Sequence, residues 1–100
     1  MFQAATLALL LVLNIPSGAE DRAIKLRINP VYPEIARRMR IEGIVVVSVT
    51  VDADGKVTDV KPVSGNRTLS IAAEDSVRKW KFVAGTGVTI VEVSINFSLQ

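Results

Sequence analysis

The side chains most able to do chemistry in this sequence are three neighbouring aspartates, Asp52, Asp54 and Asp59. Carboxylates at alternate positions are typical of a calcium loop, but such a loop ends in a bidentate glutamate. Ser64 lies near the position that this glutamate would take. An Asp-Gly pair between two β-branched runs is instead typical of a tight β-hairpin. We therefore expect a turn at Asp54-Gly55 and no metal ligands.

Catalytic chemistry has few other candidates. The 100 residues contain neither histidine nor cysteine, so the commonest metal ligands and base-assisted nucleophiles are absent. Gly85 and Gly87 lack the Lys-Ser or Lys-Thr pair that completes a phosphate-binding loop. We predict no catalytic residues and no cofactor, and a binding module rather than an enzyme.

The charge of the chain is nearly balanced. Twelve basic and ten acidic residues give a net charge of +2, which is no nucleic-acid footprint, and no nucleic-acid partner is expected. Basic residues gather at 37–40 and 78–81. We interpret these clusters as solvated helix faces, with contact to an acidic partner or an anionic lipid surface as the alternative.

The N-terminus has the pattern of an export signal. An apolar run from Ala4 to Leu13 precedes the small residues Ser17 and Ala19, so cleavage after Ala19 is predicted. The domain prediction is a signal peptide over 1–19, a short leader over 20–29 and a folded domain over 30–100. The alternative is an uncleaved inner-membrane anchor over 2–19, because about 17 apolar residues can span a bilayer. Either way, we expect the domain in the periplasm.

Hydrophobic periodicity predicts five main elements after residue 30. Pro33 begins a short basic helix over 33–40, with Gly43 just beyond it. Strands are predicted over 44–52, 56–63 and 88–99, the first two joined by the Asp-Gly turn. Val60 breaks the alternation of the second strand and indicates a bulge, and Pro62 indicates an edge. Alternation over 24–28 permits an additional short edge strand.

A second helix is predicted over 69–79, capped by Thr68 or Ser70. Glu74–Arg78 and Asp75–Lys79 are at the spacing of favourable ion pairs. Trp80 and Phe82 follow the helix and are expected in the core. The element order α-β-β-α-β predicts an α+β fold with two helices packed on a three-stranded antiparallel sheet.

The last predicted strand carries neither proline nor lysine, although these residues commonly protect an exposed edge. Its apolar side chains, Val91 to Leu99 at alternate positions, are expected to face inward. An unprotected edge can accept an extended peptide, with main-chain hydrogen bonds giving affinity. Its own helix or a second copy of the chain are the alternative occupants.

The assembled motifs resemble the C-terminal domain of the TonB family. The matching segments are YPEIARRMRIEG, VVVSVTVDADGKVTDVKPVSG, LSIAAEDSVRKWKF and VEVSINFSL. The resemblance covers nearly everything from Asn29 onward and implies the family's α+β fold. It also implies a periplasmic domain that contacts outer-membrane transporters.

The resemblance implies where a partner would bind. In the family the last strand pairs with a short transporter peptide, and the segment before Tyr-Pro approaches the transporter. The candidate partner-binding residues are therefore Asn29, Pro30, Val31, Val88, Ile90, Glu92, Ser94, Asn96 and Ser98.

The chain also departs from the family pattern. It has no histidine motif, no Pro-rich spacer and no proline after Trp-x-Phe. The expected function is docking onto a transporter peptide by strand addition. The alternatives are a membrane-anchored component that works with inner-membrane motor proteins, or a homodimer that uses the same strand edge.

Overall fold

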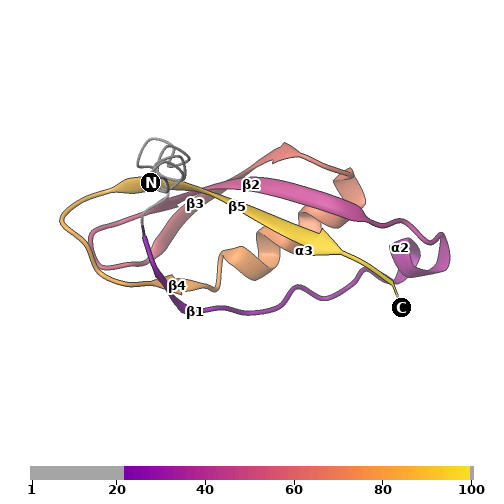
Figure 1. Cartoon of the computed structure of the whole chain (residues 1–100), viewed down its shortest axis with the longest axis horizontal. Coiled ribbons are helices and arrows are strands. Elements are labelled where there is room, and N and C mark those ends of the chain that lie inside the picture. The colour runs from indigo at the N-terminus through magenta and orange to yellow at the C-terminus, as the bar shows by residue number, and fades with distance from the viewer. Residues whose placement is uncertain (1–21, 100) are drawn as a thin grey trace, which may run out of the picture.

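A three-stranded antiparallel sheet forms the frame of the molecule. The computed structural model describes residues 22–99, so the predicted signal segment lies outside the described residues. Strand β2 (Gly43–Val51) lies between β3 (Val57–Ser64) and β5 (Thr89–Phe97), in the order β3-β2-β5 (Figure 1). Helix α3 (Arg67–Val77) crosses one face of this sheet. The predicted α+β fold, with two helices and an antiparallel three-stranded sheet, is confirmed.

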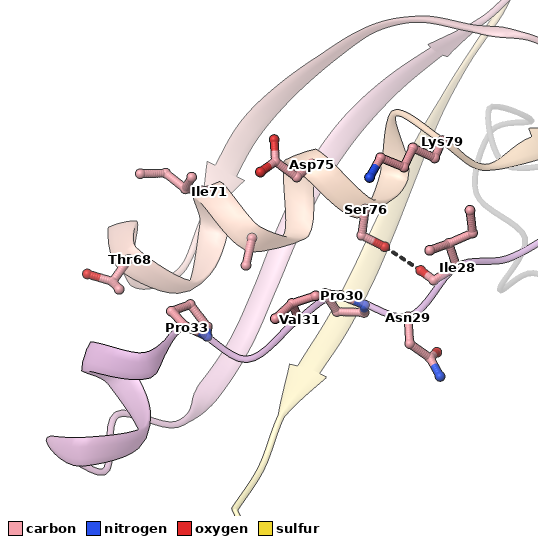
Figure 2. Close-up of a pocket in the computed structure, with 11 residues that line it drawn as sticks. Ile28, Asn29, Pro30, Val31, Pro33, Thr68, Ile71, Asp75, Ser76 and Lys79 are labelled. Atoms are coloured by element: carbon pink, nitrogen blue, oxygen red, sulfur yellow. Dashed lines mark hydrogen bonds between the residues drawn. The ribbon is translucent and has the colours of Figure 1, made fainter.

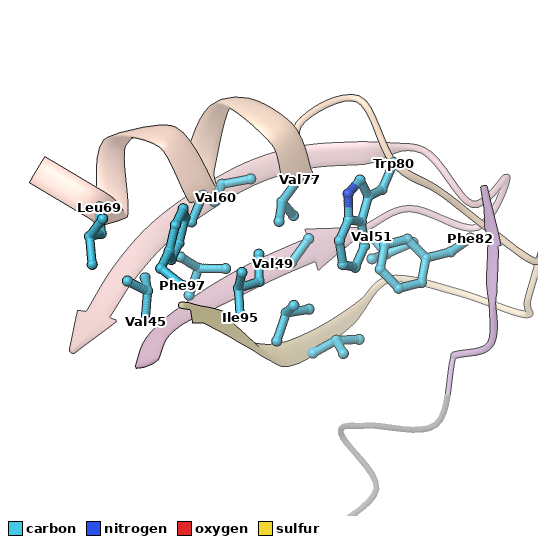
Figure 3. Close-up of a cluster of buried hydrophobic side chains, with 14 of the residues drawn as sticks. Val45, Val49, Val51, Val60, Leu69, Val77, Trp80, Phe82, Ile95 and Phe97 are labelled. Atoms are coloured by element: carbon cyan, nitrogen blue, oxygen red, sulfur yellow. The ribbon is translucent and has the colours of Figure 1, made fainter. Parts of the chain in front are cut away.

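The core lies between α3 and the sheet (Figure 3). Successive strand residues point to opposite faces, and the odd-numbered valines of β2, from Val45 to Val51, are fully buried. Odd-numbered residues of β5 from Val91 to Phe97 face the same way and are also buried, whereas Leu99 is only partly buried. Leu69, Ala73 and Val77 cover them from α3. The regular alternation in the sequence therefore produces a one-sided sheet.

The Asp-Gly turn forms as predicted. Asp52 accepts the backbone N–H groups of Asp54 and Lys56 through Oδ1, both at 2.9 Å. Gly55 has a φ of 91°, in the left-handed region that favours glycine. Its carbonyl accepts the N–H of Phe82 at 2.8 Å. The hairpin turn is therefore also the point where the chain packs against the segment after α3.

Strand β3 is irregular, as the position of Val60 predicts. The pairing with β2 shifts register between Thr50 and Val51, where Thr58 has no partner. The shift turns Val60 into the core, where it is 4% exposed, and leaves Val63 52% exposed. Pro62 lies in this edge strand, opposite Val47.

Helix α2 (Glu34–Arg38) is shorter than the predicted span of 33–40. Arg40 ends it by adopting a φ of 53°, and the N–H of Ile41 then bonds the carbonyl of Ala36 at 2.8 Å. Gly43 was the expected stop, but it begins β2 instead. A short helix closed by a left-handed non-glycine residue is not recognisable from periodicity alone.

Helix α3 begins earlier than predicted. Asn66 caps it by accepting the N–H groups of Thr68 and Leu69, so the prediction of Thr68 or Ser70 as the cap is wrong. The Glu74–Arg78 pair forms at 3.9 Å. Within residues 22–99, Asp75 and Lys79 do not form the predicted ion pair; Arg67 approaches Glu74 at 3.8 Å instead.

A second, two-stranded sheet joins the beginning of the described chain to the segment after α3. Strand β1 (Ile24–Leu26) pairs antiparallel with β4 (Lys81–Phe82). The alternation over 24–28 indicated β1, but β4 was not predicted because two residues are too few to show a period. Within the described part of the chain, no helix has the length and apolarity needed to cross a bilayer.

Trp80 provides the first test of the core. It is 1% exposed and donates its indole N–H to the carbonyl of Ile28 at 2.8 Å. Trp80→Ala is expected to lower the free energy of unfolding by about 3–5 kcal/mol, through lost packing and the cavity it leaves. Trp80→Phe keeps part of the packing and loses the N–H donor, so a smaller loss is expected. Urea titration of both variants measures the difference, and a Trp80→Ala variant as stable as wild type would contradict the burial.

Gly55 provides a test of the turn. A Cβ at this position would lie 2.0 Å from the carbonyl oxygen of Phe82, and the residue has a positive φ. Gly55→Ala is therefore expected to destabilise the domain by at least about 2 kcal/mol. Gly87→Ala is the matched control, because nothing lies within 4 Å of its Cβ position. Thermal melts that show equal losses for both variants would contradict the close contact.

Candidate functional site

The outer edge of β5 is the main feature available to a partner. β5 is the last strand of its sheet, and β2 is its only strand neighbour among residues 22–99. Within the same residues, no main-chain hydrogen bond from a loop or from β1 reaches this edge. A strand edge with unpaired N–H and C=O groups is a template for another strand.

The two hydrogen-bonding directions of β5 follow from its neighbours. In an antiparallel pair, residues of one parity direct both main-chain groups to the partner strand, and residues of the other parity direct them away. Asp52 donates to Lys56 on β3, so odd-numbered residues of β2 face β5, where they pair with odd-numbered residues such as Val93. Leu99 agrees, because its N–H bonds the Glu42 side chain at 3.1 Å, on the β2 side. Even-numbered residues therefore present their main-chain groups at the open edge.

The segment of residues 22–33, which we call the strap, runs beside α3 toward α2 (Figure 1). Arg22 fixes its beginning with five hydrogen bonds. The guanidinium donates to the carbonyls of Asp52, Val83 and Gly87 and to the Thr89 hydroxyl, at 2.9–3.2 Å. One side chain thus holds the strap against the hairpin turn and the loop before β5.

The middle of the strap is fixed by the carbonyl of Ile28. This oxygen accepts the Trp80 indole N–H at 2.8 Å and the Ser76 hydroxyl, the latter drawn in Figure 2. The Arg27 guanidinium lies over the Trp80 ring, 4.8 Å from its centroid. These contacts hold the strap against α3 and Trp80, and they leave its main chain unpaired with β5.

A groove of about 470 Å³ lies between the strap and β5; we call it the edge groove. It brings together five of the nine predicted partner-binding residues: Asn29, Pro30, Ser94, Asn96 and Ser98. The two segments are more than sixty positions apart in the sequence, so their proximity depends on the fold. The edge groove follows the C-terminal half of β5.

The remaining predicted residues lie elsewhere. Ile90 and Glu92 are exposed on the N-terminal half of β5, and Val88 precedes the strand and is 70% exposed. Val31 is 81% exposed and lines a different groove, of about 480 Å³, between the strap and α3 (Figure 2). Asn29 and Pro30 line both grooves.

The structure adds residues to the site that sequence reasoning did not assign to it. Arg27, Tyr32, Trp80 and Phe97 line the edge groove. Trp80 and Phe97 were expected only in the core, and Tyr32 only on the apolar face of a helix. Their core roles hide them from a search for outward-facing residues, because a side chain can be buried and still form the wall of a groove.

Tyr32 is fixed from three directions. Its ring packs edge-on against Phe97, with centroids 5.5 Å apart, and its hydroxyl donates to the carbonyl of Ile41 at 2.5 Å. Arg37 lies over the ring, 5.4 Å from the centroid. Desolvation raises the pKa of Tyr32 above its ordinary value of 10.0; Glu42 raises this pKa further and Arg37 opposes the change.

Comparison with known proteins places this architecture. The family described as the Gram-negative bacterial TonB protein C-terminal domain matches residues 28–99. The chain belongs to the TonB C-terminal family. Protein TonB of Xanthomonas campestris pv. campestris is 44% identical over 78 residues, which are 71% of this chain and 35% of that protein. Protein TonB of Klebsiella pneumoniae is 34% identical over 87 residues, 85% of this chain and 35% of that protein.

Solved structures of TonB C-terminal domains have the same fold. The Pseudomonas aeruginosa domain has a TM-score of 0.68 at 23% identity, covering 80% of this chain and 88% of its own. The Helicobacter pylori domain has a TM-score of 0.58 at 32% identity, covering 71% and 70%. The chain spans about a third of the length of the TonB proteins that it matches.

The hydroxyl of Tyr32 gives a pH-dependent prediction. The raised pKa means that the folded protein holds the phenolic proton more tightly than the unfolded chain. The stability that this proton contributes is fully present below pH 10 and is lost as the pH rises through the folded pKa. Wild type is therefore expected to exceed Tyr32→Phe in urea midpoint at neutral pH, and the difference should shrink above pH 10.

Tyr32 is the only tyrosine in the chain, so ultraviolet titration of phenolate formation follows this group alone. The same titration in urea gives the reference pKa of the unfolded chain. A folded-state pKa at or below the unfolded one would contradict the prediction.

Proposed function

We propose that this chain is a periplasmic TonB-type binding module that captures an extended peptide of an outer-membrane transporter by strand addition to β5. The observation that carries the proposal is the unpaired outer edge of β5, with even-numbered residues from Ile90 to Asn96 directing main-chain groups outward. Membership of the TonB C-terminal family supports the choice of partner and the link to transport.

The energy of capture comes chiefly from the main chain. Each added hydrogen bond contributes about 0.5–1.5 kcal/mol net, so several bonds along β5 are needed for useful affinity. The strand is already held by β2 along its other edge, from Gly43–Phe97 to Val51–Thr89. A partner strand therefore meets a preorganised edge and does not have to order it.

The two faces of an added strand meet different surroundings. Alternate side chains of the partner would enter the edge groove, whose wall includes Pro30, Tyr32, Trp80 and Phe97. The others would extend the open face of the sheet beside Ser94 and Asn96, which is exposed to solvent. The favoured peptide therefore alternates an apolar or aromatic side chain with a polar one.

Ser94 lies in the part of β5 that lines the edge groove, and its N–H is directed outward. Ser94→Pro removes this donor without removing a bond to β2, because proline is tolerated at a strand edge. The affinity for transporter-derived peptides is expected to fall about ten-fold or more. Isothermal titration of the full chain with synthetic peptides from the N-terminal segments of outer-membrane transporters measures the change.

Ser94→Ala is the matched control, because it removes the hydroxyl and keeps the backbone N–H. It should bind as wild type does, and Asn96→Pro should fail as Ser94→Pro does. Equal affinity of a folded Ser94→Pro variant and wild type would overturn strand addition. Sedimentation without peptide identifies the competing occupant, because a homodimer through this edge would dissociate in Ser94→Pro and persist in Ser94→Ala.

A further inference from the structure

A second hollow continues the edge groove past the C-terminal end of β5. It measures about 470 Å³ and is lined by Tyr32, Arg37, Arg40, Ser98 and Leu99. Tyr32 and Ser98 line both spaces, so the two are continuous. A peptide that follows the edge of β5 toward residue 98 therefore reaches this hollow with the residues that flank its strand-forming part.

The hollow is positively charged. Arg37 and Arg40 contribute two guanidinium groups, and no acidic residue is among its lining. The nearby carboxylates are engaged: Glu34 approaches Arg38 at 3.8 Å, and Glu42 accepts the N–H of Leu99 at 3.1 Å. Within residues 22–99, neither Arg37 nor Arg40 has an ion-pair partner.

Arg40 is also in a conformation that costs stability. Its φ of 53° is the only left-handed one at a non-glycine residue in the described chain. Glycine is the usual residue where a helix ends in this way, because a side chain there adds steric strain. Strain of this kind persists where the side chain has a use. Here the arginine side chain lines the hollow, which packing and the helix stop do not require.

We propose that this hollow binds the carboxylate of an acidic residue that flanks the strand-forming part of the partner peptide, with Arg37 and Arg40 as its ligands. The proposal rests on strand addition to β5 and adds to it the charge and position of the side chain that is selected. Two unpaired cations facing one continuous path favour an anionic group on an extended chain.

The strain at Arg40 separates a functional role from a structural one. Arg40→Gly relieves the left-handed strain, and the melting temperature is expected to rise by roughly 4 °C. The same variant should bind an acidic peptide about two- to five-fold more weakly at low salt, as expected for one exposed ion pair. Arg40→Asn, which tolerates the left-handed region, is expected to weaken binding in the same way. A loss of both stability and binding in Arg40→Gly would show a structural arginine and overturn the proposal.

The peptide itself provides the second arm of the experiment. A transporter-derived peptide that binds wild type is prepared with a pair of aspartates, or a pair of asparagines, added at either end. One aspartate peptide should bind more tightly than its asparagine counterpart, and the advantage should shrink in high salt. Arg37→Gln should remove part of this advantage. Arg38→Gln is the matched control, because Arg38 is next in sequence, pairs with Glu34 and does not line the hollow.

The outcomes distinguish this proposal from the one on which it rests. If both asparagine and aspartate peptides bind equally to the full chain, strand addition stands and the acidic preference is overturned. If Arg38→Gln reduces the preference as much as Arg37→Gln, general surface charge is responsible and the hollow is not the site. If no peptide binds in a way that depends on the N–H of Ser94, both proposals fall.

Discussion

An open three-stranded sheet has two edges, and the rest of this structure depends on how differently they are treated. Strand β3 is interrupted by two register shifts and carries Pro62, which has no N–H to offer. These are common ways to prevent one sheet from joining another. Strand β5 pairs with β2 over nine consecutive residues without a bulge. The molecule therefore has one blunted edge and one regular edge.

The strap could have closed the regular edge, but its hydrogen bonds hold it elsewhere. The carbonyl of Ile28 is bonded by Trp80 and Ser76, and the beginning of the strap is tied by Arg22 and by the pairing of β1 with β4. A strap held against α3 stands beside β5 at the distance of a groove rather than of a neighbouring strand. The same contacts that stabilise the first described residues thus shape one wall of the proposed binding site.

The sheet, the turn and the bulge were predictable from the sequence because each depends on local patterns. Alternating valines, an Asp-Gly pair and the misplaced Val60 determine their structures within a few residues. The strap, β4 and the cap at Asn66 were not predictable in this way. Their structures depend on partners far along the chain, such as Val83 for Arg22 and Ile28 for Trp80. Of the site, the strand edge followed from alternation, whereas its aromatic wall required the tertiary fold.

Alternation along β5 also separates stability from recognition. Odd-numbered residues such as Val93 and Ile95 fill the core with their side chains and bond β2 with their main chain. Even-numbered residues such as Ser94 and Asn96 face solvent with their side chains and present their main chain outward. Because recognition of an added strand relies on the main chain, side-chain changes at even positions alter selectivity while leaving both the fold and the hydrogen-bonding edge intact. Selectivity therefore has to come from residues outside β5, and the strap and the turn after α2 are the segments that lie beside its path.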